Sequence, residues 1–88
     1  MPPAAEVMYF AIVAQDRTEA DPCGLARRTF TPSGRLDEAL RRDLSWSRDA
    51  AIYEWERGEE LGAELVEISQ DDADRLIKRF RLKWGERY

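Results

Sequence analysis

The sequence predicts a small α+β domain in which a mostly antiparallel sheet carries the C-terminal helix on one face. Three observations lead to this fold class. Residues 7–14 form a nearly continuous apolar run, shorter alternating segments follow, and the end of the chain carries an apolar stripe at helical spacing. The expected order of elements is β-β-α-β-β-α.

The length of the chain limits its organisation. With 88 residues it has room for one hydrophobic core. We expect a flexible N-terminal arm at residues 1–5, which include two prolines, and a single α+β domain at residues 6–88. The hydrophobic fraction of 43% and the charged fraction of 36% suit a soluble globular protein.

The first two strands are expected at residues 7–14 and 25–31. The first is rich in β-branched and aromatic residues, as in a central strand that is covered on both faces. The second places Leu25, Arg27, Thr29 and Thr31 on one side and Ala26, Arg28 and Phe30 on the other. Residues 15–24 contain Asp-Pro and glycine and are expected to form a loop.

A helix is expected at residues 36–44, after the turn at residues 31–34. Leu36, Leu40 and Leu44 are spaced by four residues, and the segment begins with acidic and ends with basic residues, as the helix dipole prefers.

Residues 50–57 are ambiguous between a strand and a helix. As a strand, Tyr53 and Trp55 alternate with Ile52 and Glu54, whereas as a helix the preceding leucine stripe continues through Ala51 and Trp55. We favour the strand, because the serines and aspartate of residues 45–49 compete with helical hydrogen bonds. Residues 63–68 are the expected fourth strand, at a sheet edge, where Glu64 and Glu67 discourage unwanted pairing.

The C-terminal helix is expected from about residue 70 to residue 84. Ser69 suits its N-cap position and Gly85 its C-cap. Its apolar stripe is expected to pack on the sheet, and it consists of Ala73, Leu76, Ile77, Phe80 and Trp84.

The composition excludes several kinds of site. Cys23 is the only cysteine and histidine is absent, so the chain has neither an internal disulfide nor the ligands of a cysteine or histidine zinc site. It has no glycine-rich phosphate loop and no acidic calcium loop. We therefore expect no metal, cofactor or small-molecule ligand, no catalytic residue, no membrane segment, and a reducing cytoplasmic setting.

The charge is unevenly distributed. The formal net charge is -4, which argues against a surface that binds nucleic acid as a whole. The outer side of the C-terminal helix is nevertheless basic, and the region after Trp46 is rich in glutamate. The candidate partner-binding residues are Trp46, Arg75, Arg79, Arg81, Leu82 and Lys83.

We expect a non-enzymatic cytosolic protein-binding or regulatory module, whose partner is another protein or a second copy of the chain. The alternative is a nucleic-acid-binding regulator that uses the arginine and lysine side chains of the C-terminal helix.

Overall fold

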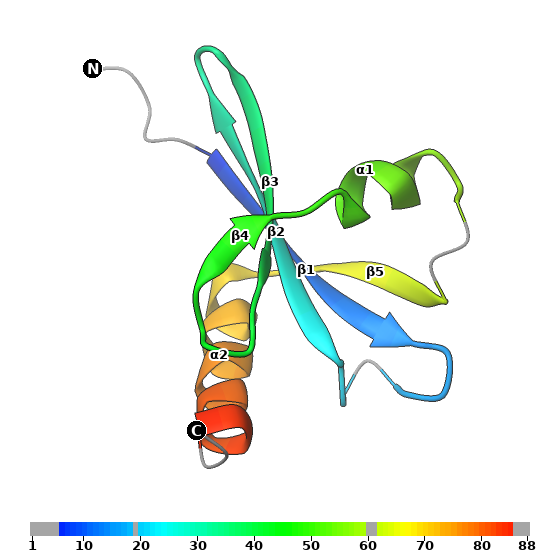
Figure 1. Cartoon of the computed structure of the whole chain (residues 1–88), viewed down its shortest axis with the longest axis vertical. Helices are drawn as coiled ribbons and strands as arrows, with labels where there is room; N and C mark the ends of the chain where they lie inside the picture. Colours follow the sequence, from blue (N-terminus) through cyan, green and yellow to red (C-terminus); the bar gives the residue numbers. More distant parts are fainter. Residues whose placement is uncertain (1–5, 19, 60–61, 86–88) are drawn as a thin grey trace.

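A five-stranded antiparallel sheet is the centre of the fold, and the computed structural model describes residues 6–18, 20–59 and 62–85 (Figure 1). The strands are β1 (Glu6–Ala14), β2 (Gly24–Thr31), β3 (Gly34–Leu40), β4 (Trp46–Arg48) and β5 (Ala63–Ile68). The helices are α1 (Ala51–Glu56) and α2 (Gln70–Gly85). The predicted α+β class is confirmed, while the expected arm at residues 1–5 lies outside the described residues.

The strand order is β4-β3-β2-β1-β5, so β1 is an inner strand and its side chains point to two covered faces. Ala11 and Val13 pack in the cluster that contains α2, while Phe10 packs with Ile52 of α1 on the opposite face. Figure 1 shows the strands passing between the two helices. The prediction of a strand covered on both faces is confirmed.

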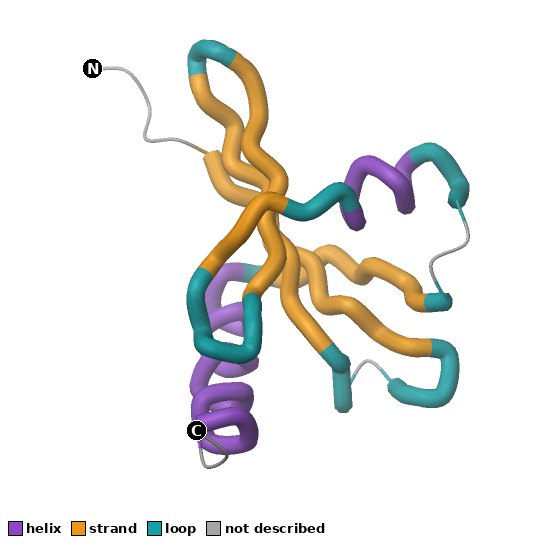
Figure 2. The backbone as a smooth tube through the Cα atoms, viewed as in Figure 1, coloured by secondary structure: helices purple, strands orange, loops and turns teal. Residues whose placement is uncertain are grey.

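The predicted helix at residues 36–44 is wrong. Residues 34–40 form β3, which pairs with β2 through a two-residue turn at Pro32 and Ser33. Gly34 has φ of 143°, a value that glycine adopts without a steric penalty. The hairpin extends beyond the rest of the sheet (Figure 2). Arg28 and Arg27 of β2 lie opposite Asp37 and Glu38 of β3 and form ion pairs with them, which favours this register.

The spacing of four residues between the leucines suggested a helix, but it fits a strand equally well, because four is a multiple of the two-residue repeat of a strand. Leu36 and Leu40 lie on the same face of β3, as residues four apart do in any strand. Leu44 lies in the following loop, where its φ of 69° is incompatible with a right-handed helix. The same segment continues into β4, which the sequence did not predict.

The preferred strand at residues 50–57 is also wrong, because this segment contains α1. Asp49 does not disrupt the helix: its Oδ1 accepts a hydrogen bond from the N–H of Ala51, the first helical residue, at 2.7 Å. Ile52 is only 1% exposed, whereas Tyr53 and Trp55 are exposed. Ile52 and Glu56 lie about one helical turn apart, and Glu56 accepts a hydrogen bond from Arg28 of the sheet at 2.7 Å.

The strand and the C-terminal helix predicted for the end of the chain are confirmed, whereas Gly85, the expected C-cap, is the last residue of α2. β5 is an edge strand, and Ser69 Oγ accepts a hydrogen bond from the N–H of Asp72 at 3.1 Å, as an N-cap does. Ala73, Leu76, Phe80 and Trp84 are buried against the sheet, and Ile77 is half-buried beside them. The rings of Phe80 and Trp84 stack at 4.3 Å between centroids.

We predict that Phe80→Ala destabilises the domain by about 3–5 kcal/mol, because it removes a buried ring and leaves a cavity between α2 and the sheet. Leu82→Ala, two residues away on the exposed side, is expected to change stability by less than about 0.5 kcal/mol. Urea denaturation followed by circular dichroism measures both values. Equal effects of the two substitutions would contradict the packing of α2.

Candidate protein-binding surface

The solvent side of α2 carries most of the expected partner-binding residues. At about 100° per residue, Arg75, Arg79 and Leu82 lie along the ridge opposite the buried stripe. Lys83 lies on the flank that faces the loop before β2. Arg81 lies about 160° around the helix from Lys83, on the other flank, so the structure does not bring these two cations together.

A hollow of about 360 Å³ lies between α2 and β5, and we call it the β5 hollow. Its apolar lining consists of Ala11, Ala20, Val66, Ile68 and Leu76. Its charged lining consists of Asp72, Arg75 and Arg79. The Arg75 side chain is 77% exposed and lies 3.5 Å from Asp72, which is a weak surface pair. Arg75 is therefore available to other carboxylates.

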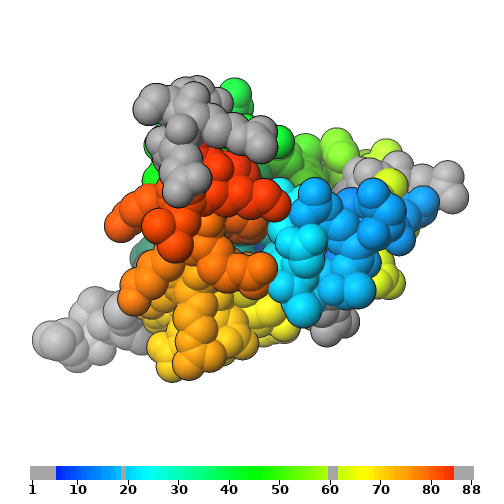
Figure 3. Space-filling view, turned by 90° about the horizontal axis from the view of Figure 1, so that it is seen from below, coloured from blue at the N-terminus to red at the C-terminus, as the bar shows by residue number. Residues whose placement is uncertain are grey.

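A second hollow of about 360 Å³ follows along the same flank of α2, and we call it the Leu82 hollow. It is lined by Asp21, Pro22, Leu76, Arg79, Phe80, Leu82 and Lys83. Leu82 is 69% exposed, the largest exposed fraction among the large hydrophobic residues that the structure describes. Figure 3 shows this part of the surface, with α2 in orange and red beside the cyan segment before and within β2.

Arg79 separates the two hollows. Its Nη1 donates a hydrogen bond to the carbonyl oxygen of Ala20 at 3.0 Å, which joins α2 to the loop between β1 and β2. A guanidinium has five N–H groups in a planar fork, so this single contact leaves donors for a carboxylate on a partner. The two hollows thus share one cation whose position is fixed.

Trp46 lies apart from these residues. It belongs to β4, at the edge of the sheet opposite β5, and it is half-buried against the α2 cluster. The Arg27 guanidinium lies 4.1 Å from the centroid of its ring, and the Tyr9 ring lies 6.5 Å away. The indole is therefore held by intramolecular contacts within a short strand.

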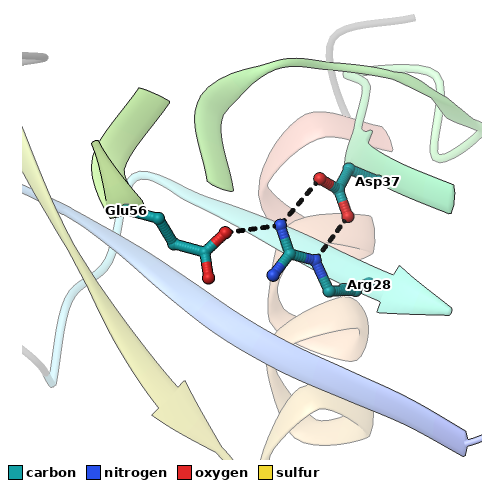
Figure 4. Close-up of polar contacts among 3 residues, drawn as sticks. All are labelled: Arg28, Asp37 and Glu56. Carbon is teal, nitrogen blue, oxygen red and sulfur yellow. Dashed lines mark hydrogen bonds and ion pairs between the residues drawn. The ribbon is translucent and has the colours of Figure 1, made fainter. Parts of the chain in front are cut away.

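A buried arginine forms the main charged network on the opposite face of the sheet (Figure 4). Arg28 Nε and Nη2 donate to the two carboxylate oxygens of Asp37 at 2.7 and 3.0 Å. Arg28 Nη2 also donates to Glu56 Oε1 of α1 at 2.7 Å. Arg28 is 5% exposed, so its charge is stabilised by these two carboxylates, and the network attaches α1 to β2 and β3.

The hydrogen bonds of this network also shift the pKa values of Arg28 and Glu56. Hydrogen bonds to Asp37 and then Glu56 raise the pKa of the Arg28 guanidinium above its usual value. The hydrogen bond from Arg28 lowers the pKa of Glu56. In the loop before β4, hydrogen bonds from Ser45 lower the pKa of Asp43. Glu56 and Asp43 are therefore ionised at neutral pH.

The sequence predicted part of this arrangement. It placed Arg75, Arg79, Leu82 and Lys83 on the exposed side of a helix, but it did not predict the hollows or the Arg28 network. A signal for the β5 hollow is Ala11, a small residue within the bulky apolar run of β1. A signal for the network is the run Arg27-Arg28 facing Asp37-Glu38, which becomes visible once the hairpin is recognised.

Among the described residues, no group of three or more cysteine, aspartate or glutamate side chains is arranged to hold a metal ion. Within the same ranges, no helix is long and apolar enough to cross a membrane. Comparisons with protein-family models, curated proteins and solved structures gave no match. The function is therefore inferred from the surfaces of this chain.

We predict that Glu56→Gln lowers the free energy of unfolding at neutral pH and that this loss disappears in acid. Because the pKa of Glu56 is lower in the folded chain than its ordinary value of 4.5, its ion pair stabilises the fold above that pH. The contribution decreases as the pH falls below 4.5 through the folded pKa. The effect should be below about 1 kcal/mol, since Glu56 is 44% exposed.

Urea denaturation of both proteins between pH 7 and pH 3 measures this difference. A Glu59→Gln variant, which alters an exposed glutamate beyond α1, controls for the change in net charge. A difference between wild type and Glu56→Gln that persists unchanged in acid would contradict the role assigned to the ion pair.

Proposed function

We propose that the chain is a non-enzymatic protein-binding module that contacts an acidic, partly apolar segment of its partner through α2. The observation that supports this most directly is the Leu82 hollow. An exposed leucine lies there beside two cations, Arg79 and Lys83, and the lining also includes the apolar residues Pro22 and Phe80. Such a surface suits a partner that has apolar side chains next to carboxylates.

The charge of this surface is local. The whole chain has a formal net charge of -4, so a positive patch on α2 contrasts with the rest of the molecule. An acidic partner is attracted to the patch and repelled by the other surfaces, which favours one orientation of binding. A partner with a uniformly positive surface would not select α2.

The two carboxylates whose pKa is shifted do not have the raised pKa of a general acid. A carboxylic acid that works as a general acid near neutral pH usually has a raised pKa. Asp43 and Glu56 have lowered pKa values, each because of a hydrogen bond to its carboxylate. Neither residue lines the Leu82 hollow or the β5 hollow.

The proposed setting is the cytosol. Cys23 is the only cysteine of the chain and its thiol is exposed and free. An exposed free thiol suits a reducing compartment, where it is not oxidised.

We predict that the double variant Leu82→Ser with Lys83→Glu loses at least about tenfold in affinity for the partner, because it removes the exposed apolar contact and reverses one cation of the hollow. The immobilised chain is used to isolate partners from an extract of the source organism, and the affinity of each purified partner is then measured by calorimetry. Arg81→Glu is the matched control, since it reverses a cation on the other flank of the same helix.

Two results would contradict the proposal. One is a partner that binds the double variant as tightly as the wild type, and the other is the absence of any specific partner. Duplex DNA and RNA are titrated at low and physiological salt in parallel. Affinity for either that is steeply salt-dependent and lost in the double variant would favour the nucleic-acid function instead.

A further inference from the structure

We propose that β5 is also an interaction surface, and that its partner is a second copy of this chain paired antiparallel through its own β5 around a two-fold axis. The contact extends the sheet across two molecules and places Glu64 of each copy beside the β5 hollow of the other. It uses a different surface from the Leu82 hollow, so the two proposals can fail separately.

The outer edge of β5 has backbone groups suited to such pairing. Gln15 N–H donates to Gly62 C=O at 3.3 Å, and the register continues with Ala14 opposite Ala63. Because residues in an antiparallel strand alternate in the direction of their N–H and C=O groups, Ala63, Leu65 and Glu67 direct theirs away from β1. None of the described residues forms a hydrogen bond with these outward groups.

The geometry of a sheet restricts the register. Directly opposed residues of an antiparallel pair point to the same face, and a two-fold axis perpendicular to the sheet keeps both α2 helices on one face. One residue of β5 then lies on the axis, which means that it lies directly opposite the same residue of the second copy. An axis at Glu64 or Glu67 would place two glutamates directly opposite each other, which is unfavourable. Leu65 and Val66 are the remaining central positions, and both pair outward groups with outward groups. In either register Glu64 and Glu67, which discourage pairing where they meet like charges, lie opposite uncharged residues of the second copy.

Either register brings Glu64 of one copy near a cation of the other. With Leu65 on the axis, Glu64 of the second copy lies opposite Val66, and with Val66 on the axis it lies opposite Ile68. Both Val66 and Ile68 line the β5 hollow together with Arg75. The exposed guanidinium of Arg75 is thus the cation available to that carboxylate.

Helix α2 leaves room for the second copy. α2 begins directly after β5 and crosses the sheet, and its end at Trp84 lies beside Arg42, in the loop between β3 and β4. It therefore leads away from the outer edge of β5. Two copies joined at this edge keep their α2 helices over their own sheets.

The first experiment blocks the edge without altering the interior of the sheet. Glu67→Pro removes an outward N–H that β1 does not use, which an edge strand tolerates. Glu67→Gln is its matched control, because it removes the same charge but keeps the N–H. Sedimentation equilibrium from about 10 µM to about 1 mM is expected to show dimerisation of the wild type and of Glu67→Gln, weakened at least about tenfold in Glu67→Pro.

The second experiment exchanges the charges. Arg75→Glu alone and Glu64→Arg alone are each expected to weaken dimerisation about two- to fivefold, as for an exposed ion pair, and the combination of both is expected to restore it. Hydrogen exchange supplies a readout that needs no variant. The amides of Ala63, Leu65 and Glu67 should become more protected as the concentration of wild type rises.

A wild type that remains monomeric at about 1 mM would overturn the proposal, and so would dimerisation that Glu67→Pro leaves unchanged. A dimer that responds to Leu82→Ser but not to Glu67→Pro would place the contact on α2 instead. Loss of dimerisation with an unchanged affinity for the isolated partner protein would show that the β5 edge and the Leu82 hollow act independently.

Discussion

The burial of the apolar side of α2 on the sheet is the contact on which the other surfaces depend. Ala73 and Phe80 pack over a part of the sheet that includes Ala11 and Leu25, so the orientation of the helix about its own axis is fixed by packing. That orientation determines which residues remain outside. Arg79 and Leu82 are exposed because the residues on the opposite side of the same turns are buried.

The second face of the sheet is held differently. Only Ile52 of the short helix α1 is fully buried there, and a six-residue helix contributes little apolar area. The hydrogen bonds of Arg28 with Asp37 and Glu56 add a specific attachment where apolar contact is limited. A charged network in that position selects one placement of α1 more strongly than it increases stability, because desolvation of Arg28 offsets much of the attraction.

The sequence correctly predicted the elements in which a long run of residues follows a single hydrophobic pattern, either that of a strand or that of a helix. β1 and α2 belong to this class, since nine strand residues and sixteen helical residues leave little ambiguity. The segment from residue 34 to residue 57 was misread twice, because its patterns are short and a spacing of four satisfies both periods. Long-range pairing decides such cases: Asp37 faces Arg28 only in the hairpin, and Glu56 reaches Arg28 only from a helix.

The sequence predicted only the part of the candidate surfaces that follows from the helical periodicity of α2. Arg75 and Leu82 are exposed by periodicity alone, whereas the hollows require β1, β5 and the loop containing Ala20 to be placed in three dimensions. Pairing of two copies through β5 would retain both α2 helices on one face of a continuous sheet. Two Leu82 hollows would then face the same side, so a partner with two acidic segments would bind both with a higher effective concentration than a single site provides. Self-association and partner binding are therefore compatible, and the first would strengthen the second only for a partner with two such segments.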